Sequence, residues 1–441
     1  MNETDLRRLA ADLDRRGLEW ELFAHDGTSH TVEVRGGEVE TLKTSRNTGV
    51  ALRLRNAGRF GFSFSTDPSR AALSRMIDQA VAAAAAMPEN PDAAFCRDAR
   101  PAPTTDLAPT ATPLTTEDRI ELAMRVERAA MAADPRVARV RKATFAEGRG
   151  DEWLANSHGL WRTAGAAHAS VSVLAIAEAA GESQTGGDFA FMRAWPGLNP
   201  EEVGRSAGLR AARSLGGSPL PTGLVTAIFE RETTAELLAV LAPAFLAESV
   251  ERNRSLLAGK IDEAIMAPCI DLDDDALDPA GAASFPFDGE GTPHQVTPLV
   301  KKGRLVGFLH DIETGHRAGR PSTGNAGRGL KSPPRPAPSN LRLSPGTGSL
   351  EQLCEAAGDG FLITELIGVH TANPVTGDFS VGASGFEIRG GRLGKPIRGV
   401  AVADNALDLF RRVAMVAGDF KYHGSMGTAS LLVPGVSISG G

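Results

Sequence analysis

The residues best suited to bind a catalytic metal in this chain are its nine histidines and the carboxylates near them. Two imidazoles close together on one helix, with a glutamate beside the first, supply metal ligands and a general base. Only His25 and His30 stand five residues apart, and no histidine pair stands four apart. Asp26-Gly27 lies between these two and predicts a hairpin turn, and no glutamate follows His25. We therefore expect surface turn residues here and no metal site.

Other reactive patterns in the chain are incomplete. The acidic run Asp271–Asp275 starts like a calcium loop, but Ala276 and Ala282 stand where that loop needs a glycine and a bidentate glutamate. Gly382-Ala383-Ser384-Gly385 lacks the spacing of a nucleophile elbow, and no dinucleotide-binding glycine motif or P-loop occurs. A hydrolase that uses Ser384 or Asp378 outside such a motif stays open as a rival interpretation.

The stretch from Gly377 to Ile388 places small residues close together among apolar ones. Glycine allows a sharp bend or the close approach of another backbone, because it has no Cβ. The stretch predicts either a strand edge that takes an extended peptide by β-augmentation, or a packed interior strand or subunit interface. The candidate contact residues are Gly377, Asp378, Phe379, Ser380, Gly382 and Ser384.

A second candidate segment runs from Thr314 to Ala326, where basic residues precede Ser322-Thr323-Gly324-Asn325. Its candidate contact residues are His316, Arg317 and Asn325. The pattern fits either a mobile loop over a cleft or an ordinary surface loop.

The chain resembles the TldD/PmbA family of bacterial two-subunit metallopeptidases. The resemblance rests on Gly377 to Ile388, on Pro396-Ile397-Arg398-Gly399-Val400 and on Asp419 to Gly427, with a further similar stretch from Gly49 to Arg53. It implies an α+β fold in which an N-terminal α/β module with a hairpin meander precedes a β-rich C-terminal domain.

Zinc-bearing subunits of this family carry H-E-x-x-x-H at the start of a helix in mid-chain. The corresponding positions here hold Arg231, Glu232 and Glu236, so only the glutamate matches. An arginine stays protonated in proteins and cannot ligate zinc. The family's C-terminal cysteine ligand is also missing, since residues 377–441 contain no cysteine. The chain thus resembles the metal-free PmbA (TldE) type of subunit.

The resemblance implies a heterodimer with a TldD-like zinc subunit, in which this chain has no cofactor of its own and the partner carries zinc. The chain would complete a chamber for extended peptides, either for proteolysis of unfolded peptides or for maturation of a ribosomally made peptide. The rivals are a homodimeric peptide-binding or structural protein, and a catalytic subunit whose metal site is assembled from separated histidines.

The composition argues against membrane and nucleic-acid functions. A net charge of −7 disfavours a nucleic-acid partner. The most apolar helical segments fall far short of the ~18–20 residues that span a membrane. The N-terminus has no apolar signal segment and the three cysteines lie far apart, so we expect a cytoplasmic protein without disulfides.

The predicted elements fall into two parts. We predict an N-terminal α+β domain at 1–218, which includes a Pro-rich linker at 88–113, and a C-terminal β-rich domain at 219–441. A predicted strand from Gly223 to Phe229 leads directly into a predicted helix from Arg231 to Val250, which would position the degenerate zinc motif.

Overall fold

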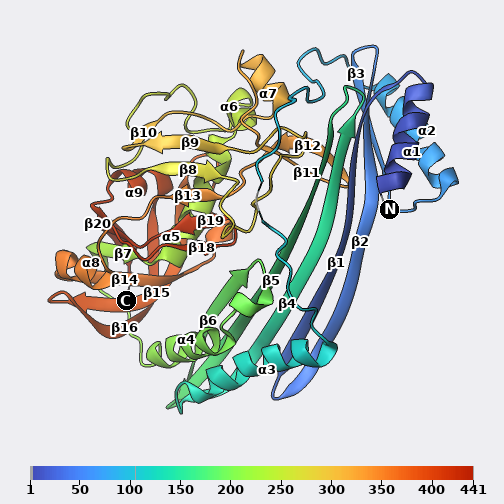
Figure 1. Ribbon diagram of the computed structural model, residues 1–441. Helices are drawn as coiled ribbons and strands as arrows, with labels where there is room; N and C mark the ends of the chain where they lie inside the picture. The colour runs from blue at the N-terminus through green and yellow to red at the C-terminus, as the bar shows by residue number, and fades with distance from the viewer. Residues whose placement is uncertain (1–2, 105, 441) are drawn as a thin grey trace.

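The computed structural model describes residues 3–104 and 106–440. Its first part is one long antiparallel sheet in the order β3–β2–β1–β4–β5–β6 (Figure 1). The strands are β1 Glu19–Arg35, β2 Glu38–Asn56, β3 Arg59–Ser65, β4 Val137–Asn156, β5 Trp161–Ala179 and β6 Glu182–Met192. The helices that pack on this sheet are α1 Glu3–Arg15, α2 Arg70–Ala86, α3 Thr116–Ala132 and α4 Pro200–Arg213.

The two helix pairs cover opposite ends of one face of this sheet. On β1, Leu22 packs with residues of α1 and α2, whereas Val32 packs with residues of α3 and α4. Side chains ten residues apart in one strand share a face, because successive side chains alternate. The polar middle of the strand lies between the two pairs. This polar middle resembles a turn in the sequence. Strand β1 nevertheless runs through it without a break, so the predicted turn at Asp26-Gly27 is wrong.

This strand also separates the two histidines that were predicted to lie in that turn. His25 and His30 are five residues apart in β1 and point to opposite faces. His25 lies beside Glu152, and the Nδ1 of His30 lies 3.0 Å from the hydroxyl of Thr44. They therefore cannot ligate one metal ion together.

The second part contains two further sheets and a short hairpin. One sheet has the order β10–β9–β8–β13–β19–β18, and its strands are β8 Leu272–Asp275, β9 Val296–Lys301, β10 Arg304–Leu305, β13 Leu341–Leu343, β18 Lys421–His423 and β19 Met426–Thr428. The other has the order β16–β15–β14–β7–β20–β17, and its strands are β7 Gly223–Phe229, β14 Gly360–Ile367, β15 Asp378–Arg389, β16 Arg392–Asn405, β17 Met415–Val416 and β20 Leu431–Ser439. Because β16 also pairs with β20, this sheet closes on itself. The hairpin is β11 Ala326–Gly329 and β12 Ser332–Pro336.

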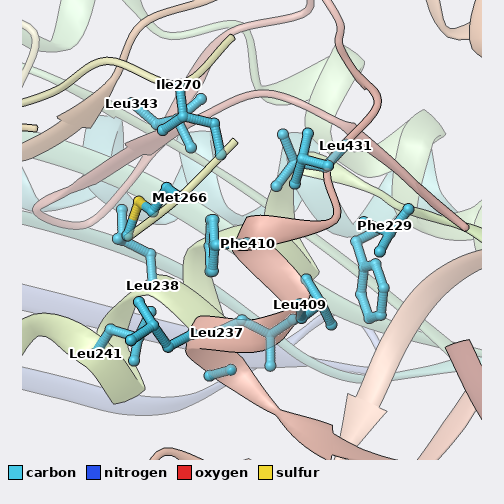
Figure 2. Close-up of a cluster of buried hydrophobic side chains, with 14 of the residues drawn as sticks. Phe229, Leu237, Leu238, Leu241, Met266, Ile270, Leu343, Leu409, Phe410 and Leu431 are labelled. Carbon is cyan, nitrogen blue, oxygen red and sulfur yellow. The ribbon is translucent and has the colours of Figure 1, made fainter. Parts of the chain in front are cut away.

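Helix α5 (Arg231–Leu241) is buried between these two sheets. Leu237, Leu238 and Leu241 pack among side chains from β7, β13, β20 and α9 (Ala406–Arg411), as Figure 2 shows. The helix begins where predicted but ends earlier, because Pro243 interrupts it. A 3-10 helix and α6 (Ala247–Glu251) follow, and the remaining helices are α7 Ile312–Arg317 and α8 Leu350–Ala357.

The predicted α+β fold class is confirmed. The Pro-rich segment forms neither helix nor strand among its described residues, and part of it is buried at Phe95 and Cys96. No helix in the described ranges is long and apolar enough to cross a membrane.

A buried group of charges joins the long sheet to the second part. Arg53 on β2 donates to Glu21 on β1 at 3.0 Å and to Glu290 at 3.2 Å. Arg328 on β11 donates to the other oxygen of Glu21 at 2.7 Å. Glu21, Arg53 and Glu290 are at most 7% exposed. Burial raises the pKa of Glu290, the acid that faces Arg53 from the second part.

Replacing Arg53 by methionine should destabilise the fold strongly. The variant leaves Glu290 buried without its cation and Glu21 with Arg328 alone, which costs on the order of 3–5 kcal/mol of unfolding free energy. Urea denaturation measures this loss. The matched control is Arg128→Met, which breaks an exposed pair with Glu121 and should cost about 0–1 kcal/mol. Equal losses in the two variants would contradict a structural role for the buried group.

Candidate functional site

The degenerate motif positions lie in the first turns of α5, next to α4 of the N-terminal part. Arg210 on α4 donates to Glu230 and to Glu232, each at 3.0 Å. The close packing of α4 on α3 fixes this arginine. A Cβ added at Gly204 or Gly208 would lie 2.3 or 2.4 Å from a backbone oxygen of α3, so only glycine permits this approach.

Arg231, at the first motif position, is bound within the chain. Its guanidinium Nη1 donates to the backbone oxygen of Asp419 at 3.2 Å. Its backbone N–H donates to the hydroxyl of Ser430 at 3.1 Å, and that hydroxyl in turn donates to the Asp419 carboxylate at 2.7 Å. Asp419 and Ser430 therefore satisfy a donor at the N-terminus of α5 that would otherwise have no acceptor.

The outer side of α5 carries a group of three carboxylates. Glu232 and Glu236 lie one turn apart on the helix, and Glu365 of β14 faces them. Burial, followed by the charges of Glu232 and Glu365, raises the pKa of Glu236 to about 7. Burial also raises the pKa of Glu365, although a hydrogen bond with Ser384 of β15 opposes that shift. Glu236 therefore binds a proton below about pH 7 and loses it as the pH rises through this value.

A β-bulge in β14 brings Glu365 and Ser384 together. Ile363 opposes Gly385 and Glu365 opposes Ser384, so Thr364 is the extra residue. Bulges re-aim side chains in this way. A Cβ at position 385 would lie 1.8 Å from the backbone oxygen of Leu362, so the bulge requires a glycine there.

His423 on β18 lies on the other side of the start of α5. Its ring meets Phe189 of β6 edge to face, at 5.4 Å between centroids. Burial, followed by the charges of Lys421, Arg231 and Arg210, lowers the pKa of His423 to about 4. Neither ring nitrogen has a hydrogen-bond partner among the residues that the structure describes. The imidazole is therefore neutral at pH 7, and three cations lie around it.

The glycine-rich stretch forms β15, and over residues 382–388 its interpretation as a strand edge is wrong. Residues 382–388 lie between β14 and β16, which pair with the strand on both sides. Positions Ser380, Gly382 and Ser384 share one face of the strand. Phe379 points the other way and is 5% exposed within the core, so it is not available to a ligand.

Gly377 and Asp378 shape the turn into β15. Gly377 has a φ of +84°, which favours glycine. Asp378 accepts a hydrogen bond from Asn405 at 2.9 Å, and this bond is the main cause that lowers the Asp378 pKa.

The second candidate segment does not join this site. His316 and Arg317 belong to α7 and bind the linker: His316 donates to the backbone oxygen of Asp92 at 2.8 Å, and Arg317 donates to its carboxylate at 3.3 Å. His316 lines a separate pocket of about 380 Å³. Asn325 is 3% exposed and donates to Asp274 at 2.8 Å, so its amide serves the interior.

Several residues of the site were not predicted from the sequence, above all Arg210, Glu365 and His423. The run Glu230-Arg231-Glu232 signals that a cation must approach the start of α5. It does not signal which of the 47 basic residues supplies that cation.

Three family models match the chain: PmbA/TldA metallopeptidase domain 1 at residues 20–84, the central domain at 109–215 and the C-terminal domain at 222–440. The chain belongs to the PmbA/TldD metallopeptidase family. Metalloprotease PmbA of Escherichia coli O157:H7 is 29% identical over 417 residues, which cover 94% of this chain and 90% of that protein. The chain is thus a member of a metalloprotease family of TldD/PmbA type, as the resemblance predicted.

Solved structures share the fold over the whole chain. TldE from Thermococcus kodakarensis matches with a TM-score of 0.91 at 22% identity, covering 99% of this chain and 100% of that chain. A Thermotoga maritima protein described as a candidate modulator of DNA gyrase matches with a TM-score of 0.92 at 24% identity, again covering 99% and 100%.

The donor set at α5 does not fit a zinc ion. Zinc takes cysteine, histidine and carboxylate ligands, whereas Arg231 occupies one motif position and Arg210 binds the only matching residue, Glu232. Over residues 3–104 and 106–440, no three His, Cys, Asp or Glu side chains form a group that could hold a metal.

Glu236→Gln should change how stability depends on pH. The folded pKa of Glu236, about 7, exceeds its ordinary value of 4.5, so the folded state binds the extra proton between these values. Wild type therefore loses stability as pH rises through this range, whereas the neutral glutamine does not. The variant should gain about 1–2 kcal/mol over wild type between about pH 4.5 and 8, allowing for solvent screening.

Urea denaturation across that pH range tests this expectation. Glu355→Gln, on the exposed side of α8, is the matched control and should follow the wild-type profile. Parallel profiles for Glu236→Gln and wild type would show that Glu236 ionises without constraint.

Proposed function

We propose that this chain is the zinc-free subunit of a heterodimeric TldD/TldE-type metalloprotease. A TldD-like partner would carry the zinc and the catalytic glutamate, and this chain would hold no cofactor. The observation that supports the proposal most strongly is the state of the motif helix. Arg231 and Glu232 are both bound within the chain, by Asp419 and Arg210. Side chains engaged in this way are not available as metal ligands or as a general base.

The contribution of this chain would be one wall of a chamber for an extended or unfolded peptide. Ser380, Gly382 and Ser384 lie on one face of β15, and Ile367 of β14 is 56% exposed beside Gly382. Since the β15 backbone is paired on both sides from Gly382 to Ile388, the peptide would lie across this face and not along an edge there. Both proteolysis of unfolded peptides and maturation of a ribosomally made peptide fit such a wall.

The cytoplasmic location belongs to the same proposal. Its support is the use of cysteine, since Cys96, Cys269 and Cys354 are all free thiols.

Co-expression with a zinc-bearing homologue that carries H-E-x-x-x-H tests the heterodimer. The chain alone should contain no stoichiometric zinc and should leave unfolded casein intact. The two chains together should co-purify and cleave it. Replacing the motif glutamate of the homologue by glutamine should abolish cleavage without dissociating the complex.

Two outcomes would contradict the proposal. Zinc that is removed from the isolated chain together with a peptidase activity would make this chain a catalytic subunit. Failure to form a complex would favour the homodimeric peptide-binding alternative.

Gly382→Val should block the β15 face without unfolding the chain. A Cβ at position 382 would lie 3.3 Å from the Cβ of Ile367, whose exposed side chain has room to move. Peptide cleavage by the complex should fall at least tenfold, at a cost of about 1 kcal/mol or less in unfolding free energy. Gly385→Ala is the packing control and should unfold the chain, because its Cβ would meet the β14 backbone. Cleavage by Gly382→Val at the wild-type rate would show that peptide does not use this face.

A further inference from the structure

The β1–β2 hairpin extends beyond β3 and leaves part of the sheet edge unpaired. β3 pairs with β2 only from Val50 to Asn56. Along residues 38–47, no strand within the described ranges pairs with the outer side of β2, and Figure 1 shows β3 beside only one end of β2. An edge of this kind offers its backbone N–H and C=O groups to another strand.

A bulge gives this edge an apolar side. Glu40 is the extra residue, because Thr41 opposes Glu33 whereas Val39 already opposes Val34. Leu42 opposes Val32, which shares a face with Val34. Val39 and Leu42 consequently lie on that same face, and they are 40% and 56% exposed.

The opposite side of this edge carries two unpaired charges. Glu38 opposes Arg35 and Lys43 opposes Thr31, so both lie on the face away from Val39 and Leu42. Neither has a hydrogen-bond or ion-pair partner among the described residues. The other charges of this stretch are engaged, Glu40 by Arg35 and Arg46 by Asp26.

We propose that this edge pairs with the same edge of a second copy of the chain. The two strands would run antiparallel about a two-fold axis between Glu40 and Thr41. Glu38 of each copy then faces Lys43 of the other, and Val39 faces Leu42. Directly opposite residues in an antiparallel pair must share a face of the sheet. Because of the bulge, Glu38 and Lys43 share one face of β2, and Val39 and Leu42 share the other.

A hollow with apolar lining lies beside the hairpin turn at which this edge begins, and a stable dimer requires such additional surface. Met131 of α3 is 40% exposed. It lines a hollow of about 610 Å³ together with the hairpin turn, Gly36-Gly37, and with Val140 of β4. A six-residue ladder alone would bury too little area, since specific interfaces bury about 1,200–2,000 Å². The second copy would therefore also cover this hollow.

A charge-swap cycle tests the pairing, with dimer dissociation measured by sedimentation velocity at low salt. Glu38→Lys and Lys43→Glu should each weaken the dimer at least about tenfold, because each places like charges opposite one another. The double variant Glu38→Lys/Lys43→Glu restores opposite charges and should return to within about threefold of wild type. Lys395→Glu, at an exposed position on β16, is the control and should leave dissociation unchanged.

Because Glu38 and Lys43 have no partner within the described chain, each variant should melt at the wild-type temperature at concentrations where both proteins are monomeric. The proposal is overturned if the wild-type chain is a monomer at about 100 µM, if neither single reversal weakens the dimer, or if the double variant fails to recover. The test uses the isolated chain and does not depend on a zinc subunit. Its failure would leave the heterodimer proposal untouched.

Discussion

The structure depends on the buried charges that join the long sheet to the C-terminal sheets. Each of these charges loses its hydration and is compensated only by its partners, so few other arrangements are tolerated. Arg53 holds Glu21 of its own sheet and Glu290 of the other part. Since α4 packs on the same long sheet, this joint also determines where Arg210 meets the start of α5.

The start of α5 shows how a group of carboxylates is kept stable at the positions of the degenerate motif. Glu230 and Glu232 receive positive charge from Arg210. Glu236 has no such partner among the described residues, and burial among like charges raises its pKa to about 7. The charges at the start of α5 are thus compensated within the chain, either by Arg210 or by a proton. The functional proposal follows from this, because such a site has no need of a metal ion.

Local rules predicted much of the fold but not the joints between its parts. The step from β7 into α5 was predicted correctly, because neighbouring residues encode it. The long strands were divided wrongly at Asp26-Gly27, because the uncovered middle of a sheet has the composition of a turn. Of the candidate site, the motif positions on α5 were found, whereas Arg210 and Glu365 were not. Their partnerships join distant elements, and no local pattern records them.

The central claim, that α5 of this chain is a metal-free counterpart of the zinc helix, is tested most directly by anomalous diffraction at the zinc absorption edge. The crystals should contain the chain in complex with a zinc-bearing homologue, grown with zinc in the buffer. We predict one peak beside the H-E-x-x-x-H helix of the homologue and none beside Glu232. A peak between Glu232 and Glu236 of this chain would contradict the claim.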